Sequence, residues 1–174
     1  MHDSVLDFVS RALPDRCKDV LEVGSRNVNG SARERITAMG YVGVDIEDGP
    51  DVDLVCSASD LIERFPEGFD VVVTTEMLEH VEDWRSAVGN LKGVTRPGGV
   101  LVVTTRSEGF PYHEHPGDFW RYSADDMRRI FADWDLEMIE DDHQAPGVFV
   151  KARRPLEPRE PVDLSGIEIL AMLP

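Results

Sequence analysis

Side chains able to move a proton gather in one short stretch of the chain and at one further position. His113, His115 and Asp118 lie close together in the sequence, and His80 directly follows an acidic residue. Histidine has an ordinary pKa near neutrality, which suits a general base that takes the proton from a hydroxyl. We expect His113 or His115 to orient an acceptor or act as the base, supported by Asp118. His80 is an equal candidate for a base or for a helix-capping or core residue.

The same histidines lie in a loop rich in aromatic side chains. This loop, residues 106–122, follows an apolar run that reads as a strand. Aromatic side chains are costly to expose, so the composition favours a lid over a substrate. Trp120 and Tyr122 are equally well explained as packing anchors. As an alternative, His113 and His115 could bind a divalent metal together with Glu76 or Asp118. Without a third fixed ligand, we assign no metal ligand.

A second group of residues is typical of a nucleotide site. The apolar run that contains Glu22 turns at Gly24 and Gly30, and Asp45 ends the next apolar run, 45 − 24 = 21 residues after Gly24. Strand–turn–helix units of this kind present backbone N–H groups to a ligand, and an acid about 20 residues further on accepts ribose hydroxyls. The spacing predicts an adenosine-type ligand.

Arg26 narrows the choice of ligand. The dinucleotide-binding fingerprint has its second glycine at this position, where the backbone must approach a pyrophosphate. The bulky Arg26 argues against that approach and favours a nucleoside without phosphates. An NAD-dependent oxidoreductase therefore remains only as an alternative.

The elements that must position these residues alternate along the chain. Strands are predicted at residues 19–23, 41–46, 52–56, 69–74, 100–105, 136–141 and 148–152, and helices at 3–13, 31–39, 60–65, 84–95 and 123–131. Such alternation predicts an α/β protein with a doubly wound, mostly parallel sheet. The last two strands are close enough in sequence to form an antiparallel hairpin at the sheet edge. The two cysteines show no disulfide or zinc-site spacing, and the sequence contains no repeats.

Three motifs in order resemble those of class I S-adenosylmethionine-dependent methyltransferases of the small-molecule type. They are Glu22-x-Gly24 with Gly30 and Asp45, the run 69–81 containing Leu78-Glu79-His80, and the segment 91–103 containing Pro97-Gly98-Gly99. The resemblance covers about residues 20–154 and departs from the usual first motif at Arg26. It implies a Rossmann-like fold and S-adenosylmethionine as cofactor.

The resemblance also implies a set of cofactor-binding residues: Glu22, Gly24, Ser25, Arg26, Gly30, Asp45, Ile46, Ser57, Ala58, Thr75, Glu76 and Met77. By position, Asp45 would accept the ribose hydroxyls, Ser57 would lie at the adenine, and Glu22 would flank the methionine part. Residues 75–77 would lie under the sulfonium. Glu22 could instead be a turn partner, and Asp45 a solvated acid at a strand end.

Composition limits the partners. With 34 acidic against 18 basic residues, a net charge of −16 should repel nucleic acids and anionic membranes. No apolar stretch approaches the roughly 20 residues that span a bilayer, and no signal-peptide pattern opens the sequence, so we expect a cytoplasmic location. We expect a domain over 1–154, with a tail over 155–174 that packs on the domain or on a second subunit of a homodimer.

These observations predict O-methylation of a polar small molecule such as a sugar, a nucleoside or a natural product. Two alternatives remain open: the oxidoreductase named above, and a methyltransferase-like module that regulates without catalysis.

Overall fold

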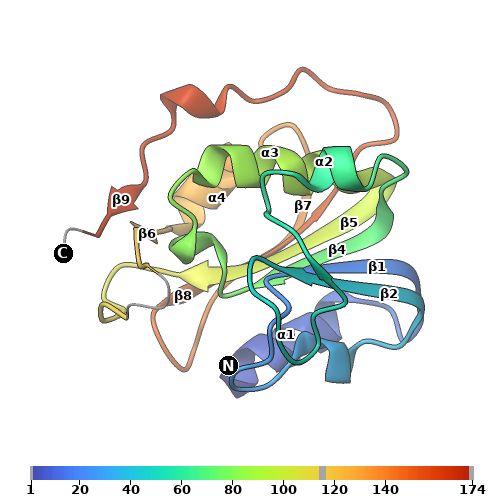
Figure 1. The fold of residues 1–174 in the computed structure, drawn as a ribbon. Coiled ribbons are helices and arrows are strands. Elements are labelled where there is room, and N and C mark those ends of the chain that lie inside the picture. The colour runs from blue at the N-terminus through green and yellow to red at the C-terminus, as the bar shows by residue number, and fades with distance from the viewer. Residues whose placement is uncertain (1, 114–116, 173–174) are drawn as a thin grey trace.

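The computed structural model describes residues 2–113 and 117–172, which form a central sheet between two layers of helices and a separate two-stranded sheet (Figure 1). The helices are α1 (Asp3–Ala12), η1 (Ala32–Arg35), α2 (Leu61–Arg64), η2 (Leu78–His80), α3 (Trp84–Val94), α4 (Ala124–Ile130) and η3 (Leu164–Gly166). The strands are β1 (Cys17–Val23), β2 (Ala38–Asp45), β3 (Leu54–Val55), β4 (Phe69–Thr75), β5 (Thr95–Arg106), β6 (Trp120–Arg121), β7 (Asp135–Asp141), β8 (Gly147–Arg153) and β9 (Leu170–Ala171).

Seven of these strands form the central sheet, in the order β3-β2-β1-β4-β5-β8-β7. The strands from β3 to β5 pair in parallel, whereas β8 pairs antiparallel with both β5 and β7. This arrangement confirms the predicted doubly wound, mostly parallel sheet with an antiparallel hairpin at its C-terminal edge. Strand β4 is buried over Val71 to Thr75, as expected of a parallel strand covered on both faces.

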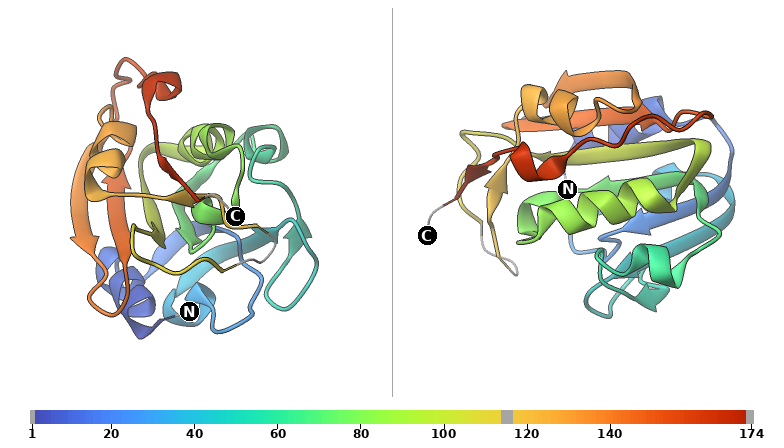
Figure 2. Two further views of the ribbon diagram at one scale, coloured as in Figure 1. Left: turned by 90° about the vertical axis from the view of Figure 1, so that its left-hand side faces the viewer. Right: turned by 90° about the horizontal axis from the view of Figure 1, so that it is seen from above.

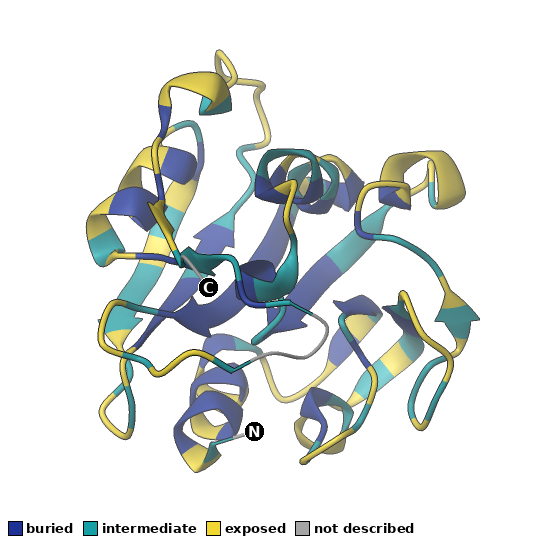
Figure 3. Ribbon diagram, turned by 60° about the vertical axis from the view of Figure 1, so that its left-hand side comes forward, coloured by how far each residue is buried: buried dark blue, intermediate teal, exposed yellow. Residues whose placement is uncertain are grey.

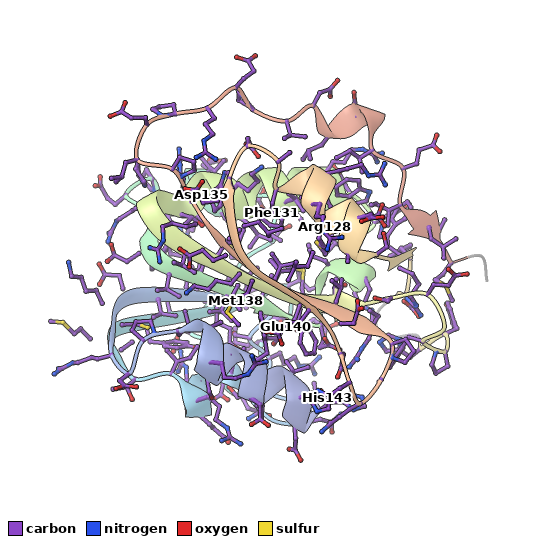
Figure 4. The ribbon with its side chains drawn as sticks, turned by 180° about the vertical axis from the view of Figure 1, so that it is seen from behind. Arg128, Phe131, Asp135, Met138, Glu140 and His143 are labelled. Carbon is purple, nitrogen blue, oxygen red and sulfur yellow. The ribbon has the colours of Figure 1, made fainter. Side chains whose placement is uncertain are left out.

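The two faces of the sheet bury separate apolar clusters. On one face α1 contributes Val5, Phe8 and Val9, and on the other α2, α3 and α4 pack over the sheet, with Trp84 fully buried. Figure 3 shows the buried residues concentrated along the strands and on the helix sides that face them. On the outer strand β7, Met138 and Glu140 lie on the side of α1 (Figure 4). The sheet therefore has no solvent-facing side over its central strands.

The predicted helix over residues 31–39 is wrong. Only one 3-10 turn forms there, η1, and the chain is extended again at Ile36, so that β2 already begins at Ala38. The connection from the end of β1 must return along the full length of the sheet. A nine-residue helix would advance only about 14 Å, because a helix rises about 1.5 Å per residue, and extended chain covers more than twice that distance.

Strand β5 also begins earlier than predicted, at Thr95 instead of Val100. Its pairing with β4 shifts register between the Phe69–Thr95 and Val71–Val100 pairs, which marks a bulge. Gly98 adopts a positive φ of 76° within that bulge. The Pro-Gly-Gly segment therefore bends the start of β5 and does not merely end the preceding helix.

The segment after residue 154 runs back over the helix layer (Figure 2). Ile167 and Ile169 are buried in the cluster that α3 and α4 also line. The Arg85 guanidinium donates to the carbonyl oxygens of Leu164 (2.9 Å) and Ile167 (2.6 Å). The segment ends in β9, which pairs antiparallel with β6. Packing against a second subunit stays a prediction.

Among the described residues, every helix is too short or too polar to cross a lipid bilayer.

Candidate functional site

The carboxyl ends of β1, β2, β3 and β4 meet at one edge of the sheet. Their register fixes this, because Val23 pairs with both Val44 and Thr74, and Val44 pairs with Leu54. Open α/β sheets bind ligands in the crevice outside the carboxyl ends of their strands. The last residues of these strands and the segments that follow them carry the predicted cofactor-binding residues.

The turn after β1 is held tightly against the segment after β4. Gly24 has a φ of 80°, and a Cβ placed on it would lie only 2.8 Å from the Met77 Cγ. The amides of Gly24 and Ser25 both donate to the Val44 carbonyl, at 2.9 and 3.0 Å, and the Ser25 hydroxyl donates to the Asp51 carbonyl. Only glycine meets both the backbone and the steric requirement at position 24. The structure thus brings Gly24, Ser25 and Met77 together.

Asp45 faces this turn. One carboxylate oxygen accepts from the Arg26 amide and the other from the Glu47 amide, each at 3.1 Å. The side chain is half-buried, and an ionised carboxylate has about four acceptor sites, so acceptor capacity remains for two hydroxyls. The exposed Ile46 follows directly in the chain.

Arg26 replaces a glycine of the usual motif without entering the crevice. Its guanidinium pairs with Glu47, and its side chain covers Gly49, where an added Cβ would come 3.0 Å from it. Only the backbone amide of Arg26 faces Asp45. The arginine is therefore compatible with the turn because its side chain lies over the neighbouring loop.

Gly30 and Ser57 lie in the turns that complete this edge. The Gly30 amide donates to the Asn27 side chain at 3.0 Å with a φ of 106°. The Ser57 hydroxyl accepts from the Ser59 amide at 3.2 Å, and Ala58 is buried beside it. Ser57 therefore stabilises the turn into α2 and remains half-buried.

Glu22 lies on the α1 side of the sheet. Its carboxyl group accepts a hydrogen bond of 2.7 Å from the Tyr41 hydroxyl and is also bonded to the Ala32 amide. Burial raises the pKa of Glu22 to about 7, against the lowering effect of the Tyr41 hydrogen bond. This placement fastens η1 to the sheet, and the predicted role beside the cofactor's methionine part stays a prediction.

The end of β4 carries a strained backbone and an unpaired hydroxyl. Glu76 has a φ of 55°, in the left-handed region that non-glycine residues rarely adopt. The hydroxyl of Thr75 is buried without a hydrogen-bond partner among the described residues. An orphaned polar atom and a glycine turn at one sheet edge suit a ligand with polar groups, and they fit S-adenosylmethionine.

The Glu76 carboxylate points to β5. It accepts from the Thr104 hydroxyl at 3.0 Å and forms an ion pair with the buried Arg106. Burial, followed by the charge of Glu79, raises the pKa of Glu76 to about 8. Arg106 thus already supplies a counter-charge to Glu76. The alternative of a metal bound by His113 and His115 with Glu76 or Asp118 stays a prediction.

The loop between β5 and β6 contacts the segment after β4 through two histidines. The His80 Nδ1 contacts the Gly117 carbonyl, and the ring centroids of His80 and His113 lie 4.8 Å apart. Asp118 accepts from the His113 amide at 2.8 Å and contacts the His113 Nδ1 at 3.1 Å. His80, His113 and Asp118 are therefore brought together, whereas His115 lies outside the described residues.

Arg121 holds the Asp118 carboxylate in place through an ion pair. The two groups form a buried bidentate pair with N–O distances of 2.5 and 2.6 Å, and Arg121 also donates to the Phe110 and Pro111 carbonyls. Burial alone would raise the pKa of Asp118, but the hydrogen bonds from Arg121 and the His113 amide outweigh it and lower that pKa. Burial, followed by the neighbouring His80, lowers the pKa of His113. A neutral imidazole and an ionised carboxylate are thus favoured side by side.

Three buried charged residues of the site were missed from the sequence: Glu79, Arg106 and Arg121. Glu79 accepts from the Thr105 hydroxyl at 2.7 Å, and burial raises its pKa to about 7. The spacing of three residues between Glu76 and Glu79 could have indicated that Glu79 also belongs to the site. Trp120 and Tyr122 donate to the Val81 and Leu78 carbonyls, which makes them packing anchors of the loop.

Comparison with known proteins identifies the family. The model of a family described as a methyltransferase domain matches residues 1–143. The ubiquinone biosynthesis O-methyltransferase of Chromobacterium violaceum is 33% identical over 116 residues, which are 58% of this chain and 49% of that protein. The chain therefore spans about half the length of this curated relative.

Two solved structures share the fold. The complex of DhpI with SAH has a TM-score of 0.64 at 19% identity, covering 89% of this chain and 84% of that one. The N-methyltransferase NodS from Bradyrhizobium japonicum, in complex with S-adenosyl-L-homocysteine, has a TM-score of 0.63 at 15% identity, covering 88% and 85%. These matches give the oxidoreductase alternative no support. The chain belongs to the methyltransferase-domain family, with the Rossmann-like fold of S-adenosylmethionine-dependent methyltransferases.

Proposed function

We propose that this protein transfers the methyl group of S-adenosylmethionine to a hydroxyl of a polar small molecule. The observation that carries the proposal is the position of the imidazole pair. His80 and His113 lie against each other at the end of β4, next to the segment 75–77 that would lie under the sulfonium. The relative from Chromobacterium violaceum is named an O-methyltransferase, which agrees with a hydroxyl acceptor.

Each residue of the site has a proposed task. The Asp45 carboxylate accepts the ribose hydroxyls, and the turn at Gly24 and Ser25 holds the methionine part with its backbone. The Ser57 hydroxyl lies at the adenine. A sulfonium methyl is already activated, so positioning and exclusion of water supply much of the rate.

The acceptor hydroxyl additionally needs a base. In our proposal His113 takes the proton, and Asp118, held ionised by Arg121, stabilises the imidazolium that forms. The acceptor oxygen then forms its bond to the methyl carbon while the carbon–sulfur bond breaks. The electron pair stays on sulfur, which leaves S-adenosylhomocysteine as a neutral thioether.

Calorimetric titration tests the cofactor part of this proposal. We expect S-adenosylmethionine and S-adenosylhomocysteine to bind with one site each, and NADH to give no heat. Absence of heat with both adenosyl ligands would overturn the proposal. The acceptor part is tested by transfer of a labelled methyl group to panels of hydroxyl and amine compounds. Transfer to amines alone would contradict the hydroxyl acceptor.

A further inference from the structure

Three side chains of the metal-binding type converge where the loop meets the end of β4. Glu79 and His80 come from η2, and His113 comes from the loop between β5 and β6. One donor atom of each lies within 4.8 Å of the donor atoms of the other two. Glu79 and His80 are adjacent in the sequence, whereas His113 is far from both, so the fold brings the three residues together.

The carboxylate of this cluster is incompletely satisfied. Glu79 is fully buried; one of its oxygens accepts from the Thr105 hydroxyl, and the other has no hydrogen-bond partner among the described residues. A buried polar atom without a partner costs free energy. The nearest guanidinium groups, Arg106 and Arg121, are already paired with other carboxylates. A bound cation would supply the missing partner.

Both imidazoles make the supporting Nδ1 contact that metal-binding histidines usually make. The His113 Nδ1 contacts the Asp118 carboxylate, and the His80 Nδ1 contacts the Gly117 carbonyl. An Nδ1–H that donates to such an acceptor leaves the lone pair of Nε2 for an ion. The pair therefore has its supporting contacts without an ion being required to form them.

We propose that Glu79, His80 and His113 bind one Zn²⁺ ion and leave its fourth position open. Two imidazole nitrogens and one carboxylate oxygen form the ligand set of many catalytic zinc sites. Metal–ligand bonds of about 2.0–2.1 Å place tetrahedral donors about 3.4 Å apart, so donor atoms that lie within 4.8 Å of one another would have to approach by at most about 1.4 Å. The half-buried His113, on a loop, can supply that movement.

Zinc binding has a consequence for the loop and for the chemistry. The ion would join the loop covalently, through His113, to the segment after β4. An imidazole nitrogen that binds an ion cannot accept a proton, so His113 would no longer be the base in the zinc-loaded protein. The proton of an acceptor hydroxyl bound to the ion would instead be lost to solvent water. Zinc lowers the pKa of a bound hydroxyl group strongly. The site is independent of cofactor binding, because none of its three ligands is a proposed cofactor contact.

Equilibrium dialysis of the tag-free, chelator-treated protein against Zn²⁺ tests this proposal. We expect one bound ion per chain and, with Co²⁺ in place of Zn²⁺, a visible absorption band of a four- or five-coordinate ion. His113→Gln and Glu79→Gln should each weaken Zn²⁺ binding at least 10- to 100-fold. His143→Gln is the matched control, since His143 is exposed beside α1 (Figure 4) and should leave binding unchanged.

The outcomes separate cleanly. Failure of the wild-type protein to bind Zn²⁺, or undiminished binding by His113→Gln with its circular dichroism spectrum intact, overturns the site. His113→Gln decides the matter alone if Glu79→Gln fails to fold. Because the titration contains no cofactor, a protein that binds S-adenosylhomocysteine but no Zn²⁺ loses this site and keeps the proposed function.

Discussion

The Tyr41 hydroxyl donates a 2.7 Å hydrogen bond to the Glu22 carboxylate, across two neighbouring strands of the sheet. Both groups are largely withdrawn from water, and burial raises the pKa values of both, that of Glu22 to about 7. A carboxyl group whose pKa in the folded state exceeds its ordinary value of 4.5 binds a proton more tightly when folded. Folding stability therefore depends on pH through Glu22, as it also does through Glu76 and Glu79, and substitution of Glu22 isolates its own share.

The first prediction concerns that dependence. Below pH 4.5 Glu22 is protonated in both states; between 4.5 and about 7 only the unfolded state loses the proton, so stability falls as pH rises. Glu22→Gln removes this loss. Between pH 4.5 and 7.5 the variant should therefore gain about 3 kcal/mol on the wild-type protein in urea unfolding, at about 1.36 kcal/mol per pKa unit. Glu34→Gln, at an exposed position, should not; equal pH profiles of Glu22→Gln and wild type would refute the idea.

The second prediction concerns the turn after β1. Gly24→Ala forces a side chain into a φ of 80° and brings its Cβ within 2.8 Å of Met77, so we expect a loss of at least about 1–3 kcal/mol from the backbone alone. Gly89→Ala is the control, because Gly89 is helical and an added Cβ meets no atom within 4 Å. That control should be neutral or gain about 0.4–1 kcal/mol. Similar unfolding midpoints for both variants would contradict the geometry.

The third prediction concerns Asp45. Hydrogen bonds to a charged group contribute about 1.5–3 kcal/mol, so Asp45→Ala should weaken binding of S-adenosylhomocysteine roughly 10- to 150-fold. Asp48→Ala removes an exposed acid whose carboxylate, among the described residues, accepts a hydrogen bond only from the neighbouring Gly49 amide. Calorimetry should show unchanged affinity for Asp48→Ala. Equal losses in the two variants would mean that net charge, and not a specific contact, sets the affinity.

The fourth prediction concerns the buried pair beneath the loop. Arg121→Met leaves Asp118 buried without its counter-ion, which should cost about 3–5 kcal/mol, and adding Asp118→Asn should recover part of that loss. Arg128→Met breaks the exposed pair with Asp125 and should cost no more than about 1 kcal/mol. Chemical denaturation of these three variants and of the wild-type protein measures each of these losses. A loss in Arg121→Met as small as in Arg128→Met would show that the buried pair is not structurally important.

Local sequence signals predicted the elements whose causes are themselves local. The sequence predicts a helix that begins at Ser123, and the structure confirms Ser123 as the N-cap of α4, in a capping box with Asp126. The run of valines likewise predicts the strand at residues 69–74, and the structure confirms it as β4. The helix predicted over residues 31–39 is wrong because the conformation of this segment depends on the distance between the end of β1 and the start of β2. No local sequence pattern reports that distance.

The site divides in the same way. Residues at strand ends, such as Asp45 and Thr75, could be placed because parallel strands share one edge. Glu79 and Arg106 could not, since their partners lie on other elements. Arg121 pairs with Asp118 three residues earlier, but the sequence does not show that the loop buries this pair. A buried charged residue is stable only when it is paired, and without knowledge of its partner the sequence predicts an ordinary surface residue.

The pairing of β9 with β6 links the end of the described chain to the loop that carries His113. Met172 donates to the Phe119 carbonyl at 2.7 Å, and Phe119 in turn donates to the Glu79 carbonyl at 2.8 Å. Two hydrogen bonds thus connect the last described residue with the acid beneath the imidazoles. A bulky affinity handle or fluorescent fusion appended there would pull on that chain of contacts, so assays should use protein labelled at the opposite terminus.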